Sequence, residues 1–145
     1  MPSVVLREVH DDDLPALFEH QSDPDSVRMT RVPARDWAAF TEHRARIRAD
    51  PEVVWRAIVA DGELAGDLVS FLRDGRREVG YRLGREHWRR GIATAALRAF
   101  LATYRERPLY AGVAADNPAS VRVLEKCGFV REREDAEGYT LVLSG

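Results

Sequence analysis

The spacing of apolar residues predicts strands and helices in a mixed order along the chain. Residues 4–9 are rich in β-branched and aliphatic side chains, which is typical of a strand. Acidic cap residues at 11–13 then precede three apolar residues at a helical spacing, Leu14, Leu17 and Phe18. This pattern predicts a helix directly after the first strand.

The next region predicts a second helix and then an antiparallel meander. The helix is expected to open at residues 35–37 and to end before Asp50, after a segment that is interrupted by Pro24 and Pro33.

Three strands are expected in the meander, at 53–60, at 64–72 and in a segment that ends at Leu83. Asp-Gly dipeptides at 61–62 and 74–75 separate them, and this dipeptide favours tight turns in which both central residues have positive φ.

The last third of the chain alternates helices with strands. Apolar or small residues recur every four positions over 92–104 and predict a helix, which a short apolar strand at 109–114 follows. A further helix is expected at 118–126, and then a final pair of strands that turns near 137–138. The strands on either side of the first of these helices should be parallel, so the fold class is mixed α/β (α+β).

Length and composition are those of one globular domain over residues 1–145 with a buried core, since 45% of the residues are hydrophobic. No apolar stretch reaches the ~20 residues that cross a bilayer, and the first seven residues do not resemble a signal peptide. We therefore expect a cytoplasmic protein without a membrane partner.

Cysteine, histidine and total charge exclude several kinds of site. Cys127 is the only cysteine, and the four histidines have no metal-ligand spacing, so neither a disulfide nor a metal is expected. The net charge of −2 argues against a nucleic-acid partner.

Charge is distributed unevenly along the chain. Residues 1–26 hold seven acidic residues against Arg7, whereas residues 73–90 hold seven arginines against three acidic residues. Solvated surface explains most such charges. The alternative is an anionic cofactor at the basic segment and a cationic substrate at the acidic one.

The segment from Trp88 to Thr94 is a candidate phosphate-binding loop, because it lies between an expected strand and an expected helix. Free amides at a helix start hold phosphate, and Gly91 and Ala93 leave room for it. Arg89 and Arg90 can add charge-assisted bonds, although solvated arginines are also common in loops.

The segment from Asn117 to Phe129 is a second signature. Residue preferences at helix ends explain part of it, since Asn117 suits the N-cap, Pro118 the first helical position and Gly128 the C-terminal end. Together with the loop, however, it resembles the GCN5-related N-acetyltransferase (GNAT) family, in the branch of the bacterial ribosomal-protein alanine N-acetyltransferases.

The resemblance implies a GNAT-like fold and activity. The expected fold is a mostly antiparallel, twisted sheet of six to seven strands, flanked by about four helices and splayed between the fourth and fifth strands. The family's loop pattern is Q/R-x-x-Gly-x-Gly/Ala, and here Trp88 takes the first place while Gly91 and Ala93 take the small ones. The implied reaction moves the acetyl group of acetyl-CoA directly to a primary amine, on a protein N-terminus or a small molecule.

The cofactor-binding residues carry over by position. The expected contacts are the pyrophosphate at Arg89, Arg90, Gly91, Ile92, Ala93 and Thr94, the pantetheine arm at Tyr81, Arg82 and Leu83, and the later helix at Asn117 and Ser120. The acceptor wall is expected in the two early helices and the final hairpin. A homodimer is left open.

The chain departs from the family at the general acid. Many members have a Tyr seven residues after the Asn, but Leu124 stands there and cannot donate a proton. Ser120 is the substitute candidate, as acid or as hydrogen-bond donor to the thiolate, against the alternative of a local backbone bond. The missing Tyr also leaves open an acyl-CoA-binding sensor or regulatory module without turnover, or a less specific nucleotide-phosphate binder.

An alkyl amine with a pKa near 10.4 must lose a proton before it attacks a thioester. Glu78 is the first candidate for the base, by resemblance, with His87 and Asp67 as alternatives. Glu78 follows Arg76 and Arg77 and has a structural alternative as a cross-strand charge partner.

The oxyanion of the tetrahedral intermediate needs an N–H donor. The strand near Arg82 or Leu83 offers one if that strand is bulged or splayed. Two tryptophans, Trp37 and Trp55, are expected to pack rather than to form a substrate cage.

Overall fold

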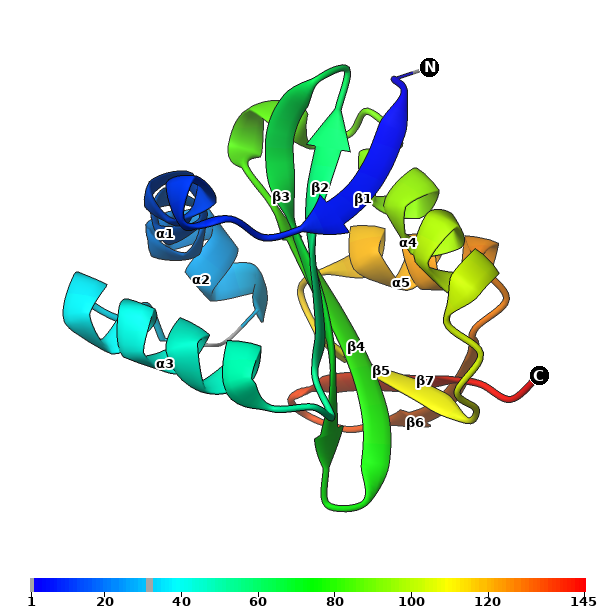
Figure 1. Cartoon of the computed structure of the whole chain (residues 1–145). Helices are drawn as coiled ribbons and strands as arrows, with labels where there is room; N and C mark the ends of the chain where they lie inside the picture. The colour runs from blue at the N-terminus through cyan, green and yellow to red at the C-terminus, as the bar shows by residue number, and fades with distance from the viewer. Residues whose placement is uncertain (1, 31–32) are drawn as a thin grey trace.

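One sheet organises the computed structural model, which describes residues 2–30 and 33–145. Its order is β1-β2-β3-β4-β5-β7-β6 (Figure 1). The strands are β1 Val4–Glu8, β2 Val54–Ala60, β3 Glu63–Arg73, β4 Arg76–Leu83, β5 Leu109–Ala114, β6 Val130–Glu134 and β7 Gly138–Leu143.

The helices lie on both faces of the sheet. One group, α1 to α3, lies on one side, and α4 and α5 lie on the other (Figure 1). Their bounds are α1 Leu14–Ser22, α2 Pro24–Thr30, α3 Trp37–Ala49, α4 Ile92–Thr103 and α5 Pro118–Lys126, with 3-10 turns at Asp11–Asp13 and Arg85–His87. Within the described ranges, no helix has the length and apolar character needed to cross a membrane.

Local sequence signals place most of these elements correctly. The predicted strand at 109–114 and helix at 118–126 have the observed bounds. Both Asp-Gly turns have positive φ at their two central residues, as a tight hairpin requires. The prediction missed α2, because Pro24 was interpreted only as a break, whereas proline also suits the first position of a helix.

The sheet divides into two parts that diverge between β4 and β5. Strands β1 to β4 form a continuous antiparallel meander. Strand β5 is parallel to β4 but pairs with it only at Arg77↔Leu109 and Glu78↔Tyr110, although β4 continues to Leu83. The predicted splay and the GNAT-like fold class are therefore confirmed.

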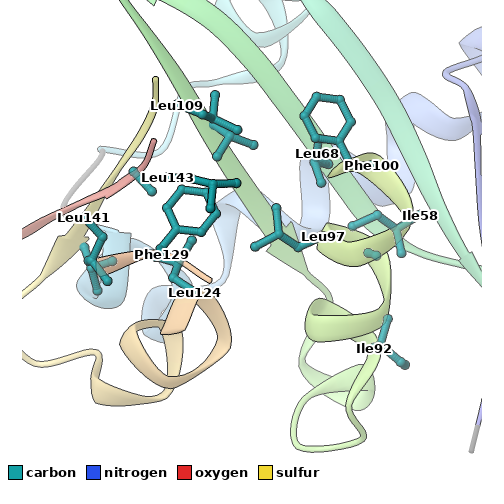
Figure 2. Packing of buried hydrophobic residues seen from close by; sticks show 14 of the residues in the cluster. Ile58, Leu68, Ile92, Leu97, Phe100, Leu109, Leu124, Phe129, Leu141 and Leu143 are labelled. Atoms are coloured by element: carbon teal, nitrogen blue, oxygen red, sulfur yellow. The ribbon is translucent and has the colours of Figure 1, made fainter. Parts of the chain in front are cut away.

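The larger core holds the two parts of the sheet together from the side of α4 and α5. Leu97 and Phe100 of α4 and Leu124 of α5 meet sheet residues such as Leu68 and Leu141 (Figure 2). Each of these side chains is buried. Because burial of such a side chain contributes about 1.5–3 kcal/mol, the two helices stabilise the sheet across its gap.

A smaller core lies under α1 and α3 on the opposite face. Leu17 and Phe40 pack there against Trp55 and Ala57 of β2. Trp55 is buried, as predicted, and Trp37 packs at the rim against Phe18 and Phe40 while remaining exposed. The early helices are thus fixed beside the face of β3 and β4 that they cover.

Gly66 is required where β3 approaches β4. A Cβ added at Gly66 would lie 2.0 Å from the carbonyl oxygen of Arg82. Residue 66 also follows the register shift that β2 shows between Ile58 and Val59.

We expect Gly66→Ala to lower the free energy of unfolding by about 1–3 kcal/mol, because two paired backbones must move apart. Urea unfolding measures the effect. Gly112→Ala is the matched control, since its Cβ meets nothing within 4 Å. Equal stability of the two variants would contradict the close approach.

Candidate active site

A cavity of about 820 Å³ opens where β4 and β5 separate. Residues of α3, β3, β4, β5, the start of α5 and the β6–β7 turn line it. The early helices and the final hairpin therefore both contribute residues to the lining of this cavity. Among the predicted site residues, Glu78, Tyr81, Arg82, Asn117 and Ser120 meet in this cavity.

The predicted phosphate loop lies outside the cavity lining, at the start of α4. Gly91 caps the helix in the left-handed conformation, with φ 76°, and offers no side chain as a cap. The first helical bond runs from Ala95 N to Gly91 O. Within the described residues, the amides of 89–94 donate to no backbone carbonyl, so they are available to an anion.

Trp88 fixes this loop to the end of β4. Its indole Nε1 donates to the carbonyl oxygen of Leu83 at 3.0 Å. Arg90 is 43% exposed, with one guanidinium nitrogen 3.7 Å from Asp61, and Arg89 is exposed. Both arginines can therefore turn toward a phosphate at the loop.

The register of β4 decides which amides face the gap. Gly84 N donates to Ala65 O, and hydrogen-bonded pairs alternate along an antiparallel ladder. The amide of Arg82 therefore faces β3, whereas those of Tyr81 and Leu83 face β5 beyond the last paired residue. Two backbone amides were expected as oxyanion donors. The orientation of the strand excludes the amide of Arg82 and leaves that of Leu83 available. The strand is splayed and shows no register shift against β3.

Helix α5 brings Ser120 against β4. The Asn117 side chain accepts from Ser120 N at 3.4 Å, so the helix-cap interpretation of Asn117 is correct. The Ser120 hydroxyl does not form the local backbone bond considered above. Its Oγ lies 2.6 Å from the hydroxyl of Tyr81, while Leu124, one turn later, is buried.

The Tyr81 hydroxyl is protonated at neutral pH. Burial raises the pKa of Tyr81 to about 12, although the hydrogen bond with Ser120 acts in the opposite direction. Sequence analysis assigned Tyr81 only to the pantetheine arm. The signal for this pairing was absent, because the two residues are 39 positions apart.

Glu78 lies on the wall of the cavity with its side chain 21% exposed. Its nearest cation is Arg73, at 3.8 Å. The neighbours Arg76 and Arg77 pair elsewhere, with Glu132 and Glu52. Glu78 therefore does have a cross-strand charge partner, Arg73 of β3, although not Arg76 or Arg77, so the structural alternative stays open beside the role of a base.

The two alternative bases are placed less favourably. His87 is buried next to Arg90 and does not line the cavity. Asp67 lines it but is 7% exposed and already accepts from Trp55 Nε1 at 2.9 Å and pairs with Arg44 at 3.1 Å. The Asp67 carboxylate is thus already occupied by an indole and a guanidinium group, which leaves less of it accessible to an amine.

The acidic residues of 1–26 do not line the cavity. Asp13 pairs with Arg7, and Asp23 and Asp25 pair with Arg85. Four of the seven carboxylates are exposed and Asp13 is buried, which agrees with mostly surface charge. Because none of the seven lines the cavity, they do not support a cationic acceptor, and the charge of the acceptor stays a prediction.

Comparisons with known proteins identify the family. The family model described as an acetyltransferase (GNAT) domain matches residues 3–130. The chain belongs to the GNAT acetyltransferase family. It is thus an acetyltransferase by family, whereas no curated protein matches the chain.

Solved structures share the fold over nearly the whole chain. A domain from Methanocaldococcus jannaschii DSM 2661 is 16% identical and covers 100% of both chains, with a TM-score of 0.81. An acetyltransferase from Agrobacterium tumefaciens str. C58 is 21% identical over 98% of this chain and 91% of that one, with a TM-score of 0.81. Aminoglycoside acetyltransferase AAC(6')-Ib in complex with coenzyme A is 20% identical over 98% and 95%, also with a TM-score of 0.81. At these identities the likeness shows the fold.

His43 of α3 gives the site a pH-dependent contribution to stability. Burial first, and then the charges of Arg35, Arg44 and Arg46, together lower the pKa of His43 to about 4. In the unfolded chain the group titrates near 6.5. Between these values the unfolded chain binds more protons, so acid favours unfolding.

We therefore expect the acetyltransferase to lose stability as the pH falls from about 6.5 toward about 4, and His43→Gln to reduce that loss. Thermal unfolding at about pH 8 and about pH 5 measures it as a difference in Tm. The wild-type difference should shrink in the variant, and an unchanged difference would refute the assignment. Burial also lowers the pKa of His20, so part of the loss remains.

Proposed function

We propose that residues 1–145 form one N-acetyltransferase domain that moves the acetyl group of acetyl-CoA directly to a primary amine. The observation that carries the proposal is the set of unbonded amides at 89–94, next to the gap between β4 and β5. A diphosphate at the helix start directs the rest of the cofactor into that gap. The structural neighbour AAC(6')-Ib, which contains coenzyme A, supports this choice of cosubstrate.

The thioester end of the cofactor is proposed to lie between β4 and the start of α5. There the amides of Tyr81 and Leu83 are oriented toward a carbonyl oxygen that gains negative charge. Ser120 donates to the departing thiolate, and Tyr81 keeps the serine hydroxyl in position. This pair supplies the donor that Leu124 cannot supply.

Glu78 is proposed to accept the proton of the amine, directly or through water. Its residue lines the cavity, and the cation that pairs with its carboxylate among the described residues is the exposed Arg73. Such a base contributes about 10² to 10⁴-fold in rate.

Trp88 and Ser120 support placement in the ribosomal-protein alanine branch, whose acceptors are protein N-termini. Small amines are the second acceptor class, because neighbours bind aminoglycosides such as kanamycin. The competing function is an acyl-CoA sensor without turnover.

Titration calorimetry with coenzyme A, together with thiol release from acetyl-CoA in a panel of amines, decides between these functions. Binding with thiol release supports the enzyme, whereas binding without release supports the sensor. Absence of binding overturns both.

Arg90→Glu should raise the apparent KM for acetyl-CoA by about tenfold, because it replaces a charge-assisted donor to phosphate with a repelling carboxylate. The change in kcat should be smaller. Steady-state kinetics measure both constants. Arg105→Glu, an exposed arginine beyond the far end of α4, makes the same charge change and should leave KM unaltered. An equal KM for the two variants would remove Arg90 from the phosphate site.

Glu78→Gln should lower kcat by about 10²-fold at low pH, where loss of the amine proton limits the rate, and by less at high pH. The pH profile of kcat measures this change. Glu134→Gln, an exposed carboxylate on β6, is the control. If the profile of Glu78→Gln matches that of the wild type, another group is the base.

A further inference from the structure

The wall of the cavity beside α3 contains a cluster of cations that the proposed chemistry does not use. We call Arg35, Arg44 and Arg82 the arginine cluster. All three line the cavity, from the segment before α3, from α3 and from β4. Sequence analysis missed the cluster because its members are far apart in the chain.

Arg44 is held rigidly in this wall. Its guanidinium lies 4.9 Å from the centre of the Phe40 ring and 4.5 Å from that of Trp55. One Nη atom pairs with Asp67 at 3.1 Å, and the side chain is 12% exposed. Its Nε is buried and has no hydrogen-bond partner in the described structure. A fixed, stacked guanidinium with unused donor capacity is suited to binding a carboxylate or phosphate.

The potential around the cluster is positive. Burial lowers the pKa of Arg44 and of Arg82, and the charge of Arg35 lowers each further, while Asp67 is the carboxylate that opposes the effect at both. Arg35 and Arg44 therefore lie close enough to act on each other's surroundings, and Asp67 contacts Arg44 directly. The lowered pKa of His43 has the same origin in part, because Arg35 and Arg44 act on it.

An acidic group lies farther along the same strand. Glu78, Gly80 and Arg82 point to one face of β4, because side chains alternate along a strand. The Cα atoms of Glu78 and Arg82 are therefore about 13 Å apart. Between them, a Cβ at Gly80 would meet nothing within 4 Å. The cavity thus has open space between an acidic end and a basic end.

We propose that the acceptor is an amine that also carries a carboxylate or phosphate group, which the arginine cluster binds. The anion lies against Arg44 and Arg35, and the amine lies over Gly80 toward Glu78. This inference rests on the proposed N-acetyltransferase function and specifies its acceptor. It differs from a polycationic acceptor such as kanamycin, which this wall would repel.

The test uses matched amines that differ only in charge. Glycine, β-alanine and γ-aminobutyrate are compared with their amides, phosphoethanolamine with ethanolamine, and kanamycin serves as the cationic probe. We expect kcat/KM to be at least about tenfold higher for the acids than for their amides, because one charge-assisted hydrogen bond to the anion contributes about that factor. The phosphate pair distinguishes a phosphate acceptor from a carboxylate acceptor.

Arg35→Glu is the informative variant, because Arg35 is exposed and its hydrogen bonds within the described residues are those of its backbone with the Gln21 side chain. It should abolish the preference for acids without changing coenzyme A binding. Arg105→Glu changes the total charge equally and should retain the preference.

Two outcomes overturn the inference alone: amides or kanamycin react as well as the acids, or the preference survives Arg35→Glu. If no probe is acetylated although coenzyme A binds, the acids and amides are each titrated into the coenzyme A complex by calorimetry. Equal heats for an acid and its amide overturn the inference. Failure of coenzyme A to bind overturns the proposed function itself.

Discussion

The early separation of β5 from β4 is the constraint on which the rest of the site depends. After two paired residues the strands diverge, and β4 continues alone to Leu83. A buried amide without a partner costs about 1–3 kcal/mol, so this stretch of backbone is complete only when water or a ligand supplies the missing acceptors. The helices α4 and α5 stabilise the arrangement, because their apolar faces join residues of both parts of the sheet in one core. Figure 2 shows Leu97 of α4 and Leu124 of α5 in this core, together with Phe129.

The two faces of β4 perform different tasks. Tyr81 faces the core of α4 and α5, where burial keeps its hydroxyl protonated. Glu78 and Arg82 face the opposite side, beside the helices α1 to α3. One strand therefore presents a hydroxyl toward the face where the cofactor is proposed to lie and charged groups toward the face proposed for the acceptor. The alternation of side chains along a strand is sufficient to keep these chemistries apart.

Sequence patterns predicted the elements well where the signal was local. Asp-Gly turns, the cap at Asn117 and the apolar spacing of 92–104 each depend on residues within a few positions of one another. The splay, in contrast, was expected only from the family resemblance, since strand pairing between β4 and β5 has no local signature. The helix at Pro24 was missed because proline marks a helix start as well as a break.

The candidate site was predicted in part for the same reason. The phosphate loop is contiguous in sequence, and its amides were assigned from the position of Gly91 at a helix start. Which charged residues line the cavity could not be predicted in this way. Asp23 and Asp25 pair with Arg85 across more than fifty positions, so the acidic segment does not contribute to the cavity. The arginines that do line it come from the segment before α3, from α3, from the end of β3 and from β4.

The contact between Tyr81 and Ser120 shows how the fold can compensate for Leu124. A tyrosine on α5 would deliver its hydroxyl from the same helix as Asn117, but here the phenol comes from β4 and the helix contributes the smaller serine. The two hydroxyls, 2.6 Å apart, join the strand on one side of the gap to the helix on the other. Because the phenol is held by burial in the core and the serine by the first turn of α5, neither group can move without disturbing an element that also frames the gap. The proposed proton donor and the gap between the strands are therefore positioned by the same contact.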